Sequence, residues 1–250
     1  MPTDTLRIPA RYCGPARSAN GGYACGRLGA YVEGPARVSL KAPPPLDRDM
    51  VLRRDGDTVV LVEETPEGER LTGLAAPGEV DVEVPEPLSP AQLAASRSAY
   101  LAAAADHALP RCFVCGPRRA PGDGLQLFTG PIAGTDRVGA HWEPAADLAA
   151  DDGLLAPEIL WAALDCPSYF ALGLHGTFAL LGQLTAEVRR RPAPGEALQV
   201  LAWPRRSEGR KHFADSAVLD AEGEAIAVAN ALWIEVKDPA FLRRLAEENA

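Results

Sequence analysis

The stretch from Pro157 to Leu184, PEILWAALDCPSYFALGLHGTFALLGQL, is the most apolar part of the sequence and constrains the fold most. From Ile159 through Ala186 the only formally charged residue is Asp165. A helix that is apolar on nearly every side must be covered on nearly every side, as it is when a sheet wraps around it. A carboxylate buried there is costly, because desolvation disfavours its charged form. Asp165 therefore needs a structural role or a chemical one.

The order of elements in the second half of the chain also occurs in the first half. Residues 38–71 and 186–226 both read as a strand, a Pro-rich bend, a strand, a charged turn, a strand, an acidic Gly turn and a strand. A helix carrying Tyr23, Leu28 and Tyr31, with Ser18 or Asn20 as its cap, precedes the first of these meanders. We interpret the pattern as an internal duplication of one unit: a strand, a buried helix and antiparallel strands.

This repeat predicts an α+β fold with two antiparallel sheets, each wrapped around a central helix. We expect an N-terminal unit over residues 1–88 and a C-terminal unit over 111–238. A connecting helix is predicted for residues 89–110, with Ser89 as its cap and Pro90 at its first position. Residues 239–250 are predicted to form a short amphipathic helix.

Composition excludes several classes of partner. The 250 residues carry a formal net charge of −9, which argues against a nucleic-acid binder. The first residues lack the pattern of a secretion signal, and Asp165, Pro167, His175 and glycines interrupt the apolar stretch, so no membrane segment is expected. Five cysteines, an odd number without the spacing of a disulfide scaffold, indicate free thiols in a reducing cytoplasm.

Three motifs resemble hotdog-fold acyl-CoA thioesterases. NGGYACG opens the first predicted helix and LWAALDCPSYFA lies in the second, and two such units in one chain resemble the double-hotdog arrangement of the acyl-CoA thioesterase II type. CFVCGPRRAPGDGLQLF, from Cys112 to Phe128, is similar to the opening segment of hotdog proteins related to the phenylacetic-acid-degradation thioesterases. The resemblance covers residues 5–85 and 111–236. It implies a double hotdog, with an acyl-CoA or related thioester as partner, whose chains could pair as a homodimer.

The resemblance also implies roles for particular residues. Asp165 stands where the thioesterase II type carries its catalytic aspartate, Asn230 falls near that family's glutamine, and Thr185 is the nearest candidate for its hydroxyl partner. The sequence departs from that pattern twice, because asparagine is one methylene shorter than glutamine and because Pro167 closely follows Asp165.

The start of the first helix is a candidate oxyanion site. Backbone N–H groups at Gly21, Gly22 and Tyr23 could polarise a thioester carbonyl, since the first N–H groups of a helix have no helical partner. An ordinary glycine-rich turn is the alternative interpretation of these glycines.

Asp165 also has a structural interpretation. Pro167 could break its helix, leaving Asp165 to cap a second segment that starts at Cys166.

Two further clusters have both a functional and a structural interpretation. Arg205, Arg206, Arg210 and Lys211 could hold the phosphates of coenzyme A or form a solvated hairpin tip.

Cys112 and Cys115 have zinc-knuckle spacing, but one such pair supplies only two of four ligands. Cys166, His107 and His141 are other candidates, and they follow no ligand spacing. We therefore favour a structural turn and expect no metal or other cofactor.

Two functions from different classes remain at this point. The chain is either a hydrolase acting on an acyl-CoA thioester, with water activated by Asp165, or a non-catalytic hotdog protein that binds an acyl or aromatic ligand or serves as an assembly partner. The two are distinguished by whether Asp165, Asn230 and the Gly21–Gly22 backbone converge on one pocket.

Overall fold

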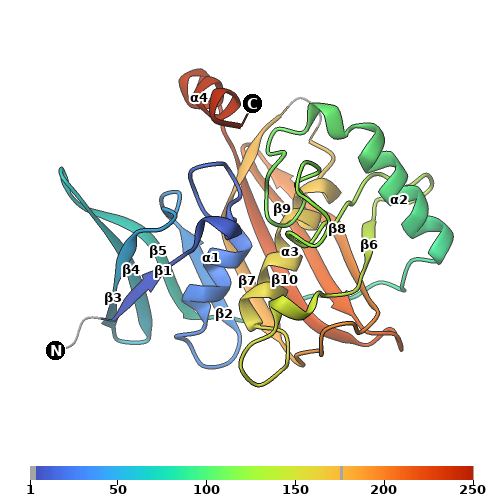
Figure 1. The fold of residues 1–250 in the computed structure, drawn as a ribbon, viewed down its shortest axis with the longest axis horizontal. Helices are drawn as coiled ribbons and strands as arrows, with labels where there is room; N and C mark the ends of the chain where they lie inside the picture. Colours follow the sequence, from blue (N-terminus) through green and yellow to red (C-terminus); the bar gives the residue numbers. More distant parts are fainter. Residues whose placement is uncertain (1–3, 175–176, 250) are drawn as a thin grey trace.

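A computed structural model describes residues 4–174 and 177–249, so His175 lies outside the described residues. Within them, ten strands form one antiparallel sheet in the order β1-β3-β4-β5-β2-β7-β10-β9-β8-β6 (Figure 1). The strands of its first half are β1 (Thr5–Arg7), β2 (Ala36–Leu40), β3 (Asp49–Asp55), β4 (Thr58–Thr65) and β5 (Gly68–Pro77). Those of its second half are β6 (Val138–Trp142), β7 (Ala179–Val188), β8 (Leu198–Glu208), β9 (Lys211–Leu219) and β10 (Ala225–Glu235).

The two halves of the sheet have the same connectivity. In each half the first strand lies at the outer edge, the second strand lies at the centre of the molecule, and a helix connects these two strands. The helices are α1 (Gly21–Gly29) and α3 (Pro157–Ala171). The halves meet where β2 pairs with β7, from Ala36 opposite Ala186 to Ser39 opposite Gln183. The predicted arrangement is thus confirmed, with the two sheets joined edge to edge into one.

The remaining helices lie outside this core. Ser89 caps α2 (Pro90–Ala102) through a capping box with Gln92, and the helix packs beside β6. The predicted connecting helix is therefore shorter than 89–110, and a 3-10 turn follows it at Ala104–Asp106. The C-terminal helix is α4 (Pro239–Asn249). No helix in the described ranges has the length and apolar character needed to cross a membrane.

Helix α3 passes through Pro167 without a break. The proline lies inside the helix, which continues to Ala171, so the alternative of a second segment capped by Asp165 is wrong. The Ser168 hydroxyl donates to the Asp165 carbonyl at 2.6 Å and accepts from the Trp233 indole N–H at 2.9 Å. Burial against the sheet and these bonds hold the helix together where local propensity disfavours it.

Helices α1 and α3 lie side by side on one face of the sheet (Figure 1). Their contact leaves no room for side chains on one face of α1. A Cβ added at Gly22 would lie 2.5 Å from Asp165 Cβ and 2.6 Å from the Trp161 carbonyl oxygen. A Cβ added at Gly26 would lie 2.6 Å from Glu158 Cα. The backbone of α1 therefore touches α3 directly at two positions, one helical turn apart.

This contact predicts that alanine destabilises the protein at one glycine of α1 and has little effect at another. In Gly26→Ala the new methyl group meets the α3 backbone, which should cost about 1–3 kcal/mol of unfolding free energy after the gain in helix propensity. In Gly29→Ala the nearest atoms are ring carbons of Trp161 at 3.1 and 3.2 Å, which can move by a few tenths of an ångström. That variant should stay within about 1 kcal/mol of the parent. Urea unfolding of both variants is the measurement, and equal destabilisation would contradict the close contact at Gly26.

Candidate functional site

The side chain of Asp165 lies in the middle of α3 and contacts the start of α1. Its Oδ2 atom accepts hydrogen bonds from the Asn20 side-chain Nδ2 at 2.7 Å and from the Gly22 backbone N–H at 2.9 Å. Its Oδ1 atom is buried and has no hydrogen-bond partner among the described residues. Asp165 thus accepts a hydrogen bond from the N-terminus of a helix, but this helix is α1 and not a second segment of its own helix.

The side chain of Asn20 bonds both to α1 and to Asp165. As the residue that caps α1, it accepts the Tyr23 N–H through Oδ1 at 2.9 Å, while its Nδ2 donates to Asp165. The sequence predicted Asn20 as one of two candidate caps and missed its bond to Asp165.

Burial dominates the electrostatics of Asp165. The residue is 2% exposed, and desolvation raises the pKa of its carboxyl to about 7, against the opposing hydrogen bonds from Gly22 and Asn20. The carboxyl group lies at the N-terminal end of α1, where the helix dipole favours negative charge.

The three candidate oxyanion residues differ in what their N–H groups do. Those of Gly22 and Tyr23 donate to Asp165 and Asn20, respectively. The Gly21 N–H has no acceptor in the part of the chain that the structure describes, as expected for the first residue of a helix. Of the three, Gly21 is therefore the residue whose N–H is available to a ligand.

Asp165, Asn20 and Gly21 line one cavity of about 760 Å³. Its volume lies in the range of pockets that enclose small molecules. Leu40, Leu46, Leu181 and Trp233 supply apolar wall, and Cys112 and Cys166 lie near Asn20 at the polar end. The cavity draws on both halves of the chain and on α4, and it joins an apolar surface to a buried carboxylate.

Basic side chains also line this cavity, and they differ in their partners. Four have acidic partners, namely Arg17, Arg48, Arg70 and Lys237. Lys41 and Arg210 are exposed, and neither has an acidic partner within 4.0 Å among the described residues. Sequence reasoning missed Lys41, because nothing near it in the sequence marks it.

The predicted basic cluster is divided by the structure. Arg205 pairs with Asp215 at 3.4 Å, and Arg206 pairs with Glu208 at 2.7 Å and stacks on Phe213. Lys211 does not line the cavity either. Arg210 is thus the member of the cluster that reaches the candidate site.

The structure does not bring Asn230 or Thr185 to Asp165. The two pair with each other across β7 and β10, and neither lines the cavity. The Asn230 Nδ2 donates to Asp215 at 2.7 Å and to the Asp81 carbonyl at 3.0 Å, on the face of the sheet away from α3. The alternating neighbours Ala229 and Ala231 face the core instead. The expectation that the candidate catalytic residues converge on one pocket is therefore corrected. Asp165 and the start of α1 do meet there, whereas Asn230 and Thr185 do not.

The cysteine pair has a third sulfur beside it. The Sγ atoms of Cys112, Cys115 and Cys166 all lie within 4.8 Å of one another, and the Cys112–Cys166 distance is 3.6 Å. Hydrogen bonds from the other two thiols lower the pKa of Cys112. His107 Nε2 lies 3.6 Å from Cys115 Sγ, whereas His141 is exposed and pairs with Glu143. The structure thus joins Cys166 and His107 to the pair and leaves His141 apart.

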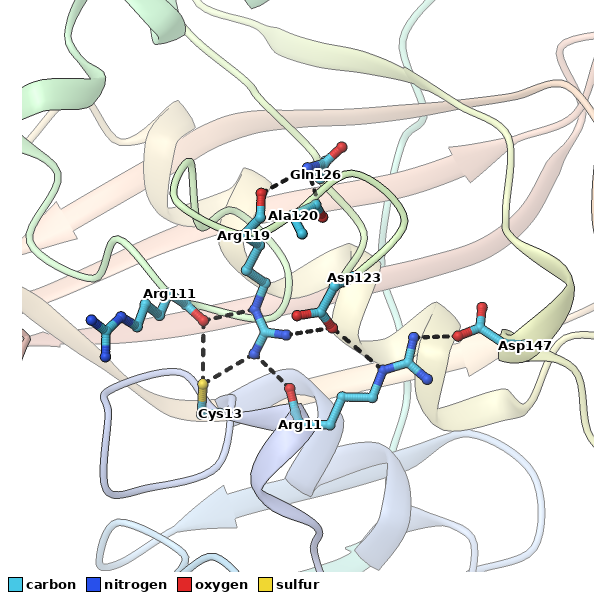
Figure 2. Close-up of polar contacts among 8 residues, drawn as sticks. All are labelled: Arg11, Cys13, Arg111, Arg119, Ala120, Asp123, Gln126 and Asp147. Carbon is cyan, nitrogen blue, oxygen red and sulfur yellow. Dashed lines mark hydrogen bonds and ion pairs between the residues drawn. The ribbon is translucent and has the colours of Figure 1, made fainter.

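The loop that carries Cys112 and Cys115 is held to the N-terminal segment by one buried arginine. Figure 2 shows the Arg119 guanidinium donating to the Arg111 carbonyl at 2.8 Å, to the Arg11 carbonyl at 2.6 Å and to Asp123 at 2.9 Å. It also donates to Cys13 Sγ at 3.2 Å. Since the Arg119 side chain is 8% exposed, these bonds form largely away from water and fix the loop beside Asn20.

Solved structures share this fold. A candidate thioesterase II from Thermobifida fusca superposes with a TM-score of 0.59 at 19% identity, covering 94% of this chain and 93% of that one. The tesB protein of Mycobacterium avium subspecies paratuberculosis gives 0.57 at 13% identity, covering 92% and 91%. A hot dog fold protein of unknown function from Alicyclobacillus acidocaldarius gives 0.58 at 13%, covering 94% and 93%.

These likenesses extend along nearly the whole chain, so the predicted double hotdog fold is confirmed. At such low identity they speak for the fold, and function must be argued from the site. No protein-family model matches the sequence, and no curated protein matches it significantly.

Proposed function

We propose that the protein hydrolyses an acyl-CoA thioester in the cavity lined by Asp165. The observation that carries this proposal is that a buried carboxylate and a helix N–H with no acceptor among the described residues, that of Gly21, meet on the wall of one partly apolar cavity. The shared fold with a candidate thioesterase II and a tesB protein is consistent with it.

The chemistry requires a base and a donor to the thioester oxygen. Asp165 accepts a proton from water as the water oxygen attacks the carbonyl carbon. The Gly21 N–H donates to the carbonyl oxygen, on which negative charge develops, and the α1 dipole favours that charge. The C–S bond then breaks, and the leaving thiolate takes up the proton. Asn20 positions the carboxylate throughout.

Charge on the cavity wall favours coenzyme A as the thiol half of the substrate. Lys41 and Arg210 are the lining cations without acidic partners in the described ranges, so they are available to phosphate groups. Leu181, Trp233 and their apolar neighbours are available to the acyl group.

The location and the association of the chain are separate proposals. All five cysteines are free of disulfides, which favours the cytoplasm as the location. Association of two chains as a homodimer stays a prediction.

Replacing Asp165 separates a chemical role from a structural one. Asp165→Asn keeps an oxygen acceptor for Gly22 and Asn20 and removes the base, so turnover of acyl-CoA should fall roughly 100-fold or more at an unchanged melting temperature. Asp165→Ala leaves two buried donors without an acceptor and should also lose roughly 2 kcal/mol of stability. Free thiol release from a panel of acyl-CoAs and thermal unfolding measure the two effects. Full activity in Asp165→Asn would contradict hydrolysis by this carboxylate and leave the non-catalytic binding function.

Asn20 offers a second test with the helix cap preserved. Asn20→Ser keeps a side-chain oxygen that can cap α1 but loses the amide that donates to Asp165. We expect kcat to fall roughly 10- to 100-fold, the equivalent of one hydrogen bond to a charged group, and the melting temperature to fall by a few degrees, because the buried carboxylate loses one donor. An unchanged kcat in this variant would show that the bond from Asn20 to Asp165 is not needed for turnover.

Arg210 and Arg206 form a matched pair for coenzyme A recognition. Arg210→Ala removes a lining cation and should raise KM for acyl-CoA roughly 3- to 5-fold, an effect that weakens with added salt. Arg206→Ala removes a cation of the same hairpin that is paired with Glu208, and KM should not change. Steady-state kinetics at low and high salt measure both. Equal KM values for the two variants would remove Arg210 from the substrate site.

A further inference from the structure

We propose that Cys112, Cys115 and Cys166 bind a thiophilic divalent metal ion, with Zn²⁺ as the expected occupant. The three sulfurs come from two segments far apart in the sequence, the loop after α2 and the middle of α3. The proposal differs from the interpretation favoured from the sequence, in which the cysteine pair forms a structural turn. The proposal is independent of the hydrolysis proposed above.

The distance between the Cys112 and Cys166 sulfurs fits one tetrahedral ion, and the Cys115 sulfur lies close to both. With Zn–S bonds of about 2.3 Å, two sulfurs on a tetrahedral zinc lie about 3.8 Å apart. The Cys112 and Cys166 sulfurs are 3.6 Å apart, and all three lie within 4.8 Å of one another. All three residues are buried, and Cys112 and Cys166 also line the cavity.

The groups around the sulfurs are those that stabilise metal-bound thiolates. The Asn20 Nδ2 lies 3.7 Å from Cys166 Sγ and 3.9 Å from Cys112 Sγ. His107 Nδ1 accepts the Leu109 N–H at 3.0 Å, so the neutral ring carries its hydrogen on Nε2, which is 3.6 Å from Cys115 Sγ. Each sulfur therefore has an N–H donor beside it, as ligands of a metal commonly do in their outer shell.

The loop is built to hold its two sulfurs in place. The Gly116 N–H donates to the Cys112 carbonyl at 2.8 Å, and a Cβ at Gly116 would lie 2.5 Å from that carbonyl oxygen. The Tyr100 hydroxyl donates to the Cys115 carbonyl, and Arg119 ties the loop to the N-terminal segment (Figure 2). Binding would release the thiol protons to solvent as the three thiolates form.

Metal content is the direct test. The chain without a histidine tag, expressed with added zinc and purified without chelator, should contain about one zinc per chain by mass spectrometry. Cys112→Ser should lose it. Cys25→Ser is the matched control, because it removes a buried thiol of α1 that lies outside the three-sulfur cluster, and it should keep the metal.

Measurements on the unaltered protein guard against a variant that fails to fold. X-ray absorption at the zinc edge should give about three sulfur ligands at about 2.3 Å and one nitrogen or oxygen ligand. Replacement by Co²⁺ should produce a thiolate-to-cobalt absorption band. Less than about 0.1 zinc per chain without such a band, equal zinc in Cys112→Ser and Cys25→Ser, or a metal-free Cys112–Cys166 disulfide would each overturn the proposal. None of these readouts depends on activity.

Discussion

The direct backbone contact between α1 and α3 is the constraint on which the candidate site depends. Because Gly22 and Gly26 have no side chains, α1 approaches α3 until the Gly22 N–H reaches the Asp165 carboxylate at 2.9 Å. A side chain at Gly22 would separate the helices and remove that bond together with the packing. The close contact thus provides the partner of the buried carboxylate, and the carboxylate satisfies a helix N–H that would otherwise be buried without an acceptor.

The pairing of β2 with β7 brings the two central helices into this contact. It joins two halves of equal connectivity into one sheet, and it places their central helices next to each other on the same face. Asn20 and Gly21 come from the first half and Asp165 from the second. Each half alone therefore carries an incomplete site. The two central helices also differ in character, since α1 supplies backbone donors and a cap, and α3 supplies the carboxylate.

Sequence reasoning reached the features that are local and missed those that depend on distant contacts. A lone charge in an apolar stretch marks Asp165, which was predicted as a site residue, whereas Asn20 was predicted only as one of two candidate caps of the first helix. Their hydrogen bond joins residues 145 positions apart, which no spacing reveals. The resemblance implied a catalytic role for Asn230, whereas a period-two count along β10 from the core-facing Trp233 through Ala231 and Ala229 places its side chain on the other face. At Pro167 the tertiary packing of α3 prevailed over the local tendency to break.

Asn20 connects the candidate site to the cysteine cluster. Its amide nitrogen lies 2.7 Å from Asp165 Oδ2, 3.7 Å from Cys166 Sγ and 3.9 Å from Cys112 Sγ, yet it has two hydrogens for these three acceptors. The shortest of these contacts is the one to the carboxylate, so Asp165 takes the larger share of the donor. Metal-bound thiolates accept hydrogen bonds more strongly than thiols do, so the proposed metal would direct the second amide hydrogen to the sulfurs while the first stays on Asp165. Asn20 would thereby link the proposed metal to the carboxylate, through one side chain that also caps α1.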